Sequence, residues 1–104
     1  RNHVAWAEAL AAKLAAEPDF EITSAPFLSL FSFRYAPAGV DDPDALNQQL
    51  FDRINDDGRI YLTQTRVDGQ FVIRFQVGAF STEEADVDFA FDVIREIADG
   101  LGTG

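Results

Sequence analysis

The chain has 104 residues, 47% of them hydrophobic, and its 18 acidic against 8 basic residues give a formal net charge of −10. This length suits one compact domain with a core of its own. The sequence has no Cys and a single His, His3, which excludes a disulfide framework, thiolate chemistry and a Cys/His metal site. The negative charge argues against nucleic acid and anionic membranes as partners, and no apolar run approaches the roughly 20 residues that span a bilayer.

The first third of the sequence predicts one helix and two strands. Apolar residues recur at helical spacing over residues 3–16, where alanine is abundant. Residues 20–24 alternate apolar and polar positions as a short strand does, and Pro26 is expected to break this strand. Residues 28–35 (LSLFSFRY) predict a second, antiparallel strand, and its apolar content favours a central place in the sheet. Arg34, near the end of that strand, is expected to reach solvent.

A second helix is predicted after a loop over residues 36–42. Asp42 suits the N-cap, Pro43 suits the first helical position, and Gly58 supplies the C-terminal stop. The apolar face of this helix is expected to consist of Leu46, Leu50 and Ile54, with Phe51 beside them.

Residues 59–77 (RIYLTQTRVDGQFVIRFQV) predict a β-hairpin. Asp68 and Gly69 tolerate the positive φ angles of a type I′ turn, whose twist matches the strands on either side. The second strand alternates apolar and polar residues, and its apolar face is expected to pack against another layer of the fold. The opposite face carries Arg74 in mid-strand, between Val72 and Gln76.

The last helix is predicted to begin with a capping box, Ser81 followed three residues later by Glu84. It should run to about residue 98 and end at Gly100, and residues 101–104 are expected to fray. Its buried stripe is predicted to contain Val87, Ala90, Phe91, Ile94 and Ile97.

These elements follow the order α-β-β-α-β-β-α and form a single α+β domain over residues 1–104. We expect a four-stranded antiparallel sheet with three helices packed on one face. The other face of the sheet is then open. With Phe31, Phe33 or Tyr35 and Val72 pointing to it, we expect an exposed apolar patch there, which is typical of an interface.

The residues alone reveal no catalytic constellation. The sequence lacks a Gly-rich phosphate loop and a Ser-His-Asp set, and its many carboxylates form no inward-facing pair on one element. Arg74 has two interpretations. It is either a solvated strand residue or local ion pair, or a guanidinium presented to a carboxylate or phosphate.

Four segments together, however, carry a resemblance to a known family: LSLFSFRY, LNQQLFDRIN, DGRIYLTQTRVDGQFVIRF and EEADVDFAFDVIREIA. In this order they resemble the C-terminal small domain of the group II pyridoxal-phosphate-dependent decarboxylases, which include the aromatic-L-amino-acid and tyrosine decarboxylases. The resemblance covers residues 6–98.

The resemblance implies a C-terminal fragment of a longer, cytoplasmic, homodimeric enzyme of fold type I, which converts an amino acid, by family frequency an aromatic one, to an amine and CO₂. Its cofactor, pyridoxal 5′-phosphate, and its catalytic lysine would lie in a large domain. Lys13 is in the wrong segment and has no preceding His. We therefore expect no catalytic, cofactor-binding or metal-binding residue in this chain, which would be inactive alone and would pack on the large domain.

Arg74 is the one position that the resemblance carries over, because members of the family present an arginine from this strand near the active-site rim. Its implied role is to bind the substrate carboxylate or to support the active-site wall, and the competing role is an ion pair at the contact with the large domain. Two other interpretations of the whole chain stay open. It could be a stand-alone α+β binding or dimerisation module, or the small domain of a pyridoxal-phosphate-dependent aminotransferase.

Overall fold

The computed structural model describes residues 3–27, 30–76 and 84–101. Their elements, in chain order, are α1 (His3–Ala15), β1 (Phe20–Phe27), β2 (Leu30–Tyr35), α2 (Pro43–Asp57), β3 (Thr63–Val67), β4 (Gln70–Gln76) and α3 (Glu84–Asp99). The strands form one antiparallel sheet in the order β1-β2-β4-β3. The predicted α+β class and the predicted order of elements are both confirmed.

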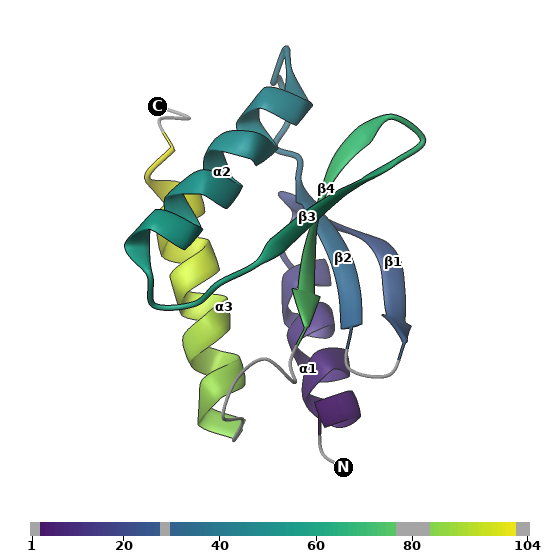
Figure 1. The fold of residues 1–104 in the computed structure, drawn as a ribbon, viewed down its shortest axis with the longest axis vertical. Helices are drawn as coiled ribbons and strands as arrows, with labels where there is room; N and C mark the ends of the chain where they lie inside the picture. The colour runs from purple at the N-terminus through teal and green to yellow at the C-terminus, as the bar shows by residue number, and fades with distance from the viewer. Residues whose placement is uncertain (1–2, 28–29, 77–83, 102–104) are drawn as a thin grey trace.

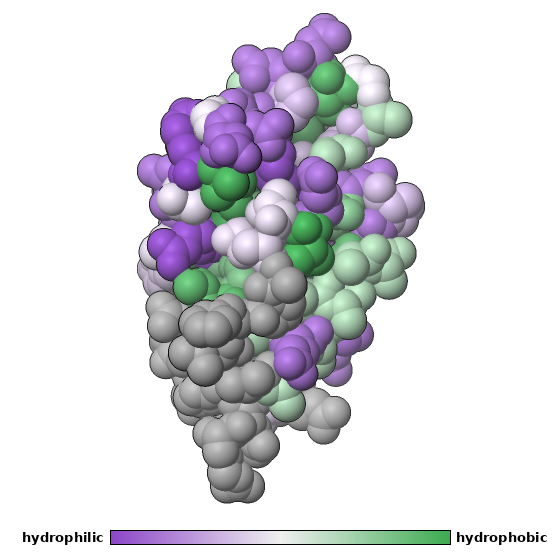
Figure 2. All heavy atoms as spheres, turned by 90° about the vertical axis from the view of Figure 1, so that its right-hand side faces the viewer, coloured by the Kyte–Doolittle hydropathy of each residue, from purple (hydrophilic) through white to green (hydrophobic). Residues whose placement is uncertain are grey.

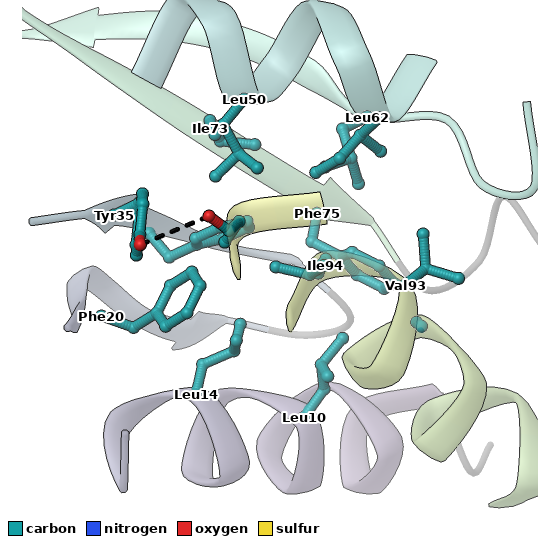
Figure 3. Packing of buried hydrophobic residues seen from close by; sticks show 14 of the residues in the cluster. Leu10, Leu14, Phe20, Tyr35, Leu50, Leu62, Ile73, Phe75, Val93 and Ile94 are labelled. Carbon is teal, nitrogen blue, oxygen red and sulfur yellow. Dashed lines mark hydrogen bonds between the residues drawn. The ribbon is translucent and has the colours of Figure 1, made fainter. Parts of the chain in front are cut away.

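All three helices contribute to the core on one side of the sheet. Helix α1 packs on β1 and on α3, while α2 packs on β4, β2 and α3 (Figure 1). Figure 3 shows how side chains from every layer meet between sheet and helices. The buried residues labelled there are Leu10, Leu14, Phe20, Tyr35, Leu50, Leu62, Ile73, Phe75, Val93 and Ile94.

The predicted caps and turn of the middle of the chain are confirmed. Asp42 Oδ1 accepts a hydrogen bond from the Ala45 amide at 3.1 Å, and Gly58 ends α2 with a φ of 82°. Asp68 and Gly69 have φ angles of 53° and 81°, as a type I′ turn requires. The predicted capping box at residues 81–84 lies outside the described residues and side chains.

The prediction of an apolar patch on the open sheet face is wrong. Phe31, Phe33 and Tyr35 occupy alternate positions of β2, so all three point to the helices, and each is at most 2% exposed. Phe31 lies opposite Phe75 of β4, and their rings stack with centroids 5.7 Å apart. Val72 does lie on the open face but is only 1% exposed.

Instead, the open face is mainly polar. By strand alternation it carries Ser32, Arg34 and Arg74 from the two central strands, and Thr63 and Thr65 from β3. Figure 2 views the side of the molecule where the strands lie, and hydrophilic residues dominate its upper part with separate hydrophobic ones between them.

Several predicted boundaries also differ from the structure. Strand β1 continues through Pro26, because it is an edge strand and has no partner on one side that would need the missing N–H. Leu101 is 8% exposed and belongs to the core, so fraying does not begin there. The first hairpin strand begins at Thr63 rather than at Arg59, because the Asn55 side chain takes both backbone groups of Leu62.

Candidate functional site

Arg74 lies in the middle of β4, a central strand, on the open face of the sheet. Its backbone neighbours are Ser32 on β2 and Thr63 on β3. Its side chain is half-buried. Among the side chains that the structure describes, no carboxylate lies within 4.0 Å of its guanidinium. Arg74 therefore offers a charged, planar set of donors that no described acid neutralises.

Arg34, on the same face of β2, is engaged in a different way. It is only 5% exposed, which contradicts the prediction that it reaches solvent. Its Nη1 donates to Asp44 Oδ1 at 2.9 Å and to the Phe71 carbonyl at 2.6 Å. Burial of the guanidinium requires such partners, because an unpaired buried charge is costly. The two arginines of this face thus have separate roles, Arg34 being paired inside the protein and Arg74 unpaired among the described residues.

Asp44, in the first turn of α2, completes this arrangement. Its Oδ1 also accepts the Phe71 amide at 3.0 Å, and its Oδ2 lies 3.7 Å from Arg66 Nη1. The hydrogen bond from Arg34, followed by that from the Phe71 amide, holds the pKa of the Asp44 carboxyl below its usual range. We name Arg34, Asp44 and the Phe71 backbone the Arg34–Asp44 clamp. Sequence reasoning missed it, because its members are separated by up to 37 residues.

A second polar contact joins α2 to the end of β2. Asn47 is fully buried, and its Oδ1 accepts the Tyr35 amide at 2.7 Å. Its Nδ2 donates to the carbonyls of Tyr35 and Pro43, both at 2.8 Å. On one side Tyr35 pairs with Phe20 of β1, and on the other the Asn47 amide takes the place of a strand partner.

The remaining charged groups of the described residues form ion pairs or lie in solvent. Lys13 pairs with Asp88 at 3.2 Å and lies over the Phe91 ring, on the α1–α3 side of the molecule. The described residues contain no group of three or more His, Cys, Asp or Glu that could hold a metal ion. No helix within the described ranges is long and apolar enough to cross a bilayer.

Comparisons with known proteins identify the family. No protein-family model matches the chain. Over 104 residues it is 39% identical to tryptophan decarboxylase TDC1 of Camptotheca acuminata, covering 97% of this chain and 21% of that protein. The structure of Catharanthus roseus tryptophan decarboxylase in complex with L-tryptophan matches with a TM-score of 0.90 and 33% identity, over 97% of this chain and 21% of that one. The chain is homologous to the C-terminal part of the aromatic amino-acid decarboxylases, in the group II pyridoxal-phosphate-dependent family.

A structure of the Oryza sativa decarboxylase TDC with PLP and tryptamine matches with a TM-score of 0.89 and 30% identity, over 97% of this chain and 22% of that one. The chain thus spans about a fifth of the length of the decarboxylases it matches. The predicted resemblance to the C-terminal domain of this family is confirmed.

The residues of this chain do not fit a pyridoxal-phosphate site of their own. A Schiff base needs a lysine beside the cofactor, and Lys13, the only lysine in the sequence, forms an exposed ion pair with Asp88 between α1 and α3. The sequence has no Gly-rich phosphate-loop motif. Among the described side chains, Arg74 lies on the open face of the sheet without an acidic partner.

Proposed function

We propose that this chain is the C-terminal domain of a pyridoxal-phosphate-dependent decarboxylase that converts an aromatic L-amino acid to an amine and CO₂. Its own work is to pack on the large domain of the same chain and to complete one wall of the active site. The cofactor, the catalytic lysine and the homodimer contacts that form the site belong to the remaining four-fifths of the enzyme. Alone, the domain is inactive.

The observation that carries this proposal is the state of Arg74. A guanidinium that is half-buried in the centre of a sheet normally has a partner, because desolvation without one is unfavourable. No described acid serves Arg74, whereas Arg34 on the same face has two partners. The missing partner of Arg74 is a carboxylate from outside the described residues, and a bidentate pair is the geometry that guanidinium favours.

The open sheet face supports a domain contact. Contacts between domains of one chain are more polar than a protein core. This face presents Thr63, Thr65 and the half-buried Arg74 beside the buried Ser32 and Arg34. Such a face suits an interface with a carboxylate-bearing surface.

Substitution of Arg74 by Lys in the full-length enzyme tests the proposal. Lys keeps the charge but cannot form the paired hydrogen bonds. Loss of one charge-assisted hydrogen bond costs about 1.5–3 kcal/mol, so kcat/KM for the amino acid should fall about ten-fold or more. Amine formation from L-tryptophan, L-tyrosine and L-phenylalanine, measured with added pyridoxal phosphate, supplies the rates.

Arg53→Lys is the matched control, since Arg53 is exposed on α2 and should tolerate the change with unchanged rates. The quaternary state of both variants should be compared by light scattering. A raised KM with an intact dimer favours contact with the substrate carboxylate, whereas a weakened assembly with normal kinetics per active dimer favours an ion pair at the domain contact. Wild-type kinetics and assembly in Arg74→Lys would remove any role for Arg74.

The two alternative interpretations give different results. A small domain of an aminotransferase predicts transfer of the amino group to a 2-oxo acid without release of CO₂. A stand-alone binding or dimerisation module predicts neither reaction, and it places the missing carboxylate of Arg74 on a second protein molecule.

A further inference from the structure

The ladder between β2 and β4 ends before β4 does. Its residue pairs run from Leu30–Gln76 to Phe33–Ile73 and do not reach Phe71. The β3–β4 ladder continues past this point to Val67–Gln70. The N-terminal part of β4 therefore pairs with the edge strand β3 on one side and has no strand partner on the β2 side.

The Arg34–Asp44 clamp takes the place of the missing ladder partners. Phe71 donates its amide to Asp44 Oδ1 at 3.0 Å and accepts a hydrogen bond from Arg34 Nη1 at its carbonyl at 2.6 Å. Both backbone groups on that side of β4 are thus satisfied by side chains. The two side chains are also bonded to each other at 2.9 Å, so neither can move independently.

The clamp is fixed to the rest of the domain at both of its ends. Arg34 belongs to β2, where burial restricts its side chain. Asp44 belongs to the first turn of α2, and three residues later Asn47 binds both backbone groups of Tyr35. Strand β2, helix α2 and strand β4 therefore meet at one polar junction, three residues before Arg74.

We propose that Arg34 and Asp44 are positioning residues for Arg74. By holding the backbone of Phe71, they fix the rotation of β4 about its own axis and hence the direction in which Arg74 leaves the sheet. This inference rests on the proposed function of Arg74. The clamp itself touches neither substrate nor cofactor, and its effect on the reaction passes through β4.

Two variants of the full-length enzyme test the role. Asp44→Asn keeps an oxygen acceptor for the Phe71 amide but removes the charge that neutralises Arg34. The double variant Arg34→Met with Asp44→Asn removes both charges, so that no unpaired buried charge is left to unfold the domain. Asp52→Asn is the matched control, because Asp52 is on the same helix, is exposed, and its carboxylate accepts a hydrogen bond from Gln48 at 3.3 Å.

Each variant is made in the wild-type and in the Arg74→Lys background, and amine formation is measured. A small misplacement of a substrate-binding group can cost about a hundred-fold in rate. We expect the clamp variants to lower kcat/KM about ten-fold or more in the wild-type background. The share of this loss that comes from KM and the share that comes from kcat should be the same as in Arg74→Lys. In the Arg74→Lys background they should have little further effect, since the group that they position is already changed.

Hydrogen exchange at the Phe71 amide supplies a readout that does not depend on activity. Protection should decrease in the clamp variants and stay unchanged in Asp52→Asn. Equal losses of kcat/KM in both backgrounds would overturn the inference, because they would show that the clamp acts through stability alone. Unchanged protection at Phe71 would overturn it as well.

The same experiment separates this inference from the proposed function. If the wild-type enzyme makes no amine, the proposed function fails, and hydrogen exchange still decides whether the clamp holds β4. If the enzyme is active but Arg74→Lys is silent, the positioning role is overturned while the decarboxylase assignment stands.

Discussion

The sequence predicts the environment of some single residues, such as Arg74, but not of others, such as Arg34. The spacing of apolar residues and the alternation of strands are local patterns, so Arg74 was correctly predicted on the face of its strand opposite the core. The fate of Arg34 depends on Asp44 and Phe71, which no local pattern connects to it. Two arginines in similar strand sequences, FSFRY and FVIRF, therefore have opposite environments that only the fold reveals.

At the scale of single residues, we predict that the Asp44 carboxyl makes the free energy of unfolding depend on pH. Its pKa is lowered in the folded chain, first by the hydrogen bond from Arg34. A carboxyl whose pKa is lower folded than unfolded contributes stability above its unfolded pKa, of about 4, and the contribution is lost as pH falls through the folded pKa. We expect the difference in urea midpoint between wild type and Asp44→Asn to be largest near neutral pH and to shrink below about pH 4.

Asp57 contributes in the same direction, because the hydrogen bond from Arg59 lowers the pKa of its carboxyl. Asp57 is untouched by the Asp44 substitution, so its contribution cancels in the comparison of the two proteins. A midpoint difference that is constant from pH 7 to pH 3 would contradict the role given to the Asp44 charge.

At the scale of elements, α2 organises the sheet through two asparagines. Asn47 binds both backbone groups of Tyr35, and Asn55 binds both backbone groups of Leu62, at 2.8 and 3.1 Å. Both asparagines lie in LNQQLFDRIN, one of the segments that carry the family resemblance. The sequence predicted α2 and its caps correctly, because periodicity and capping are local. It misplaced the start of β3, because that boundary is set by a side chain on another element.

We predict that Asn47→Ala lowers the free energy of unfolding by roughly 2–4 kcal/mol, because it leaves buried backbone groups of Tyr35 without partners. Asn55→Ala should cost less, about 1 kcal/mol, because its site is only partly buried and water can replace the amide. Urea unfolding of both variants measures the two values, with exposed Gln49→Ala as the control. Equal and small losses for all three substitutions would contradict the account of α2.

At the scale of the whole molecule, the domain has one buried side and one open side. The helices and the apolar face of the sheet share a continuous core (Figure 3). The sequence correctly predicts a sheet face without helices, but it wrongly predicts that this face is apolar. The prediction of an apolar patch counted the aromatic residues of β2 without following their alternation, which places all three in the core. The face is mainly polar, and of its two arginines Arg34 is buried against Asp44, which leaves Arg74 for the contact with a carboxylate that we propose.

The length of the chain limits what it can do alone. It matches only about a fifth of the decarboxylases to which it is homologous, and its residues do not fit a cofactor site. Activity is therefore a property that we propose for a larger molecule, to which we also propose that this domain supplies Arg74 and a wall of the active site.

The most direct test of this account is the release of CO₂ by the full-length protein that carries this chain. The protein should be loaded with pyridoxal phosphate and given L-tryptophan, L-tyrosine or L-phenylalanine labelled at the carboxyl carbon. We predict labelled CO₂ from at least one of them, one molecule for each amine formed, and none from residues 1–104 alone. If the loaded full-length protein releases no labelled CO₂ from any of the three, the central claim is contradicted.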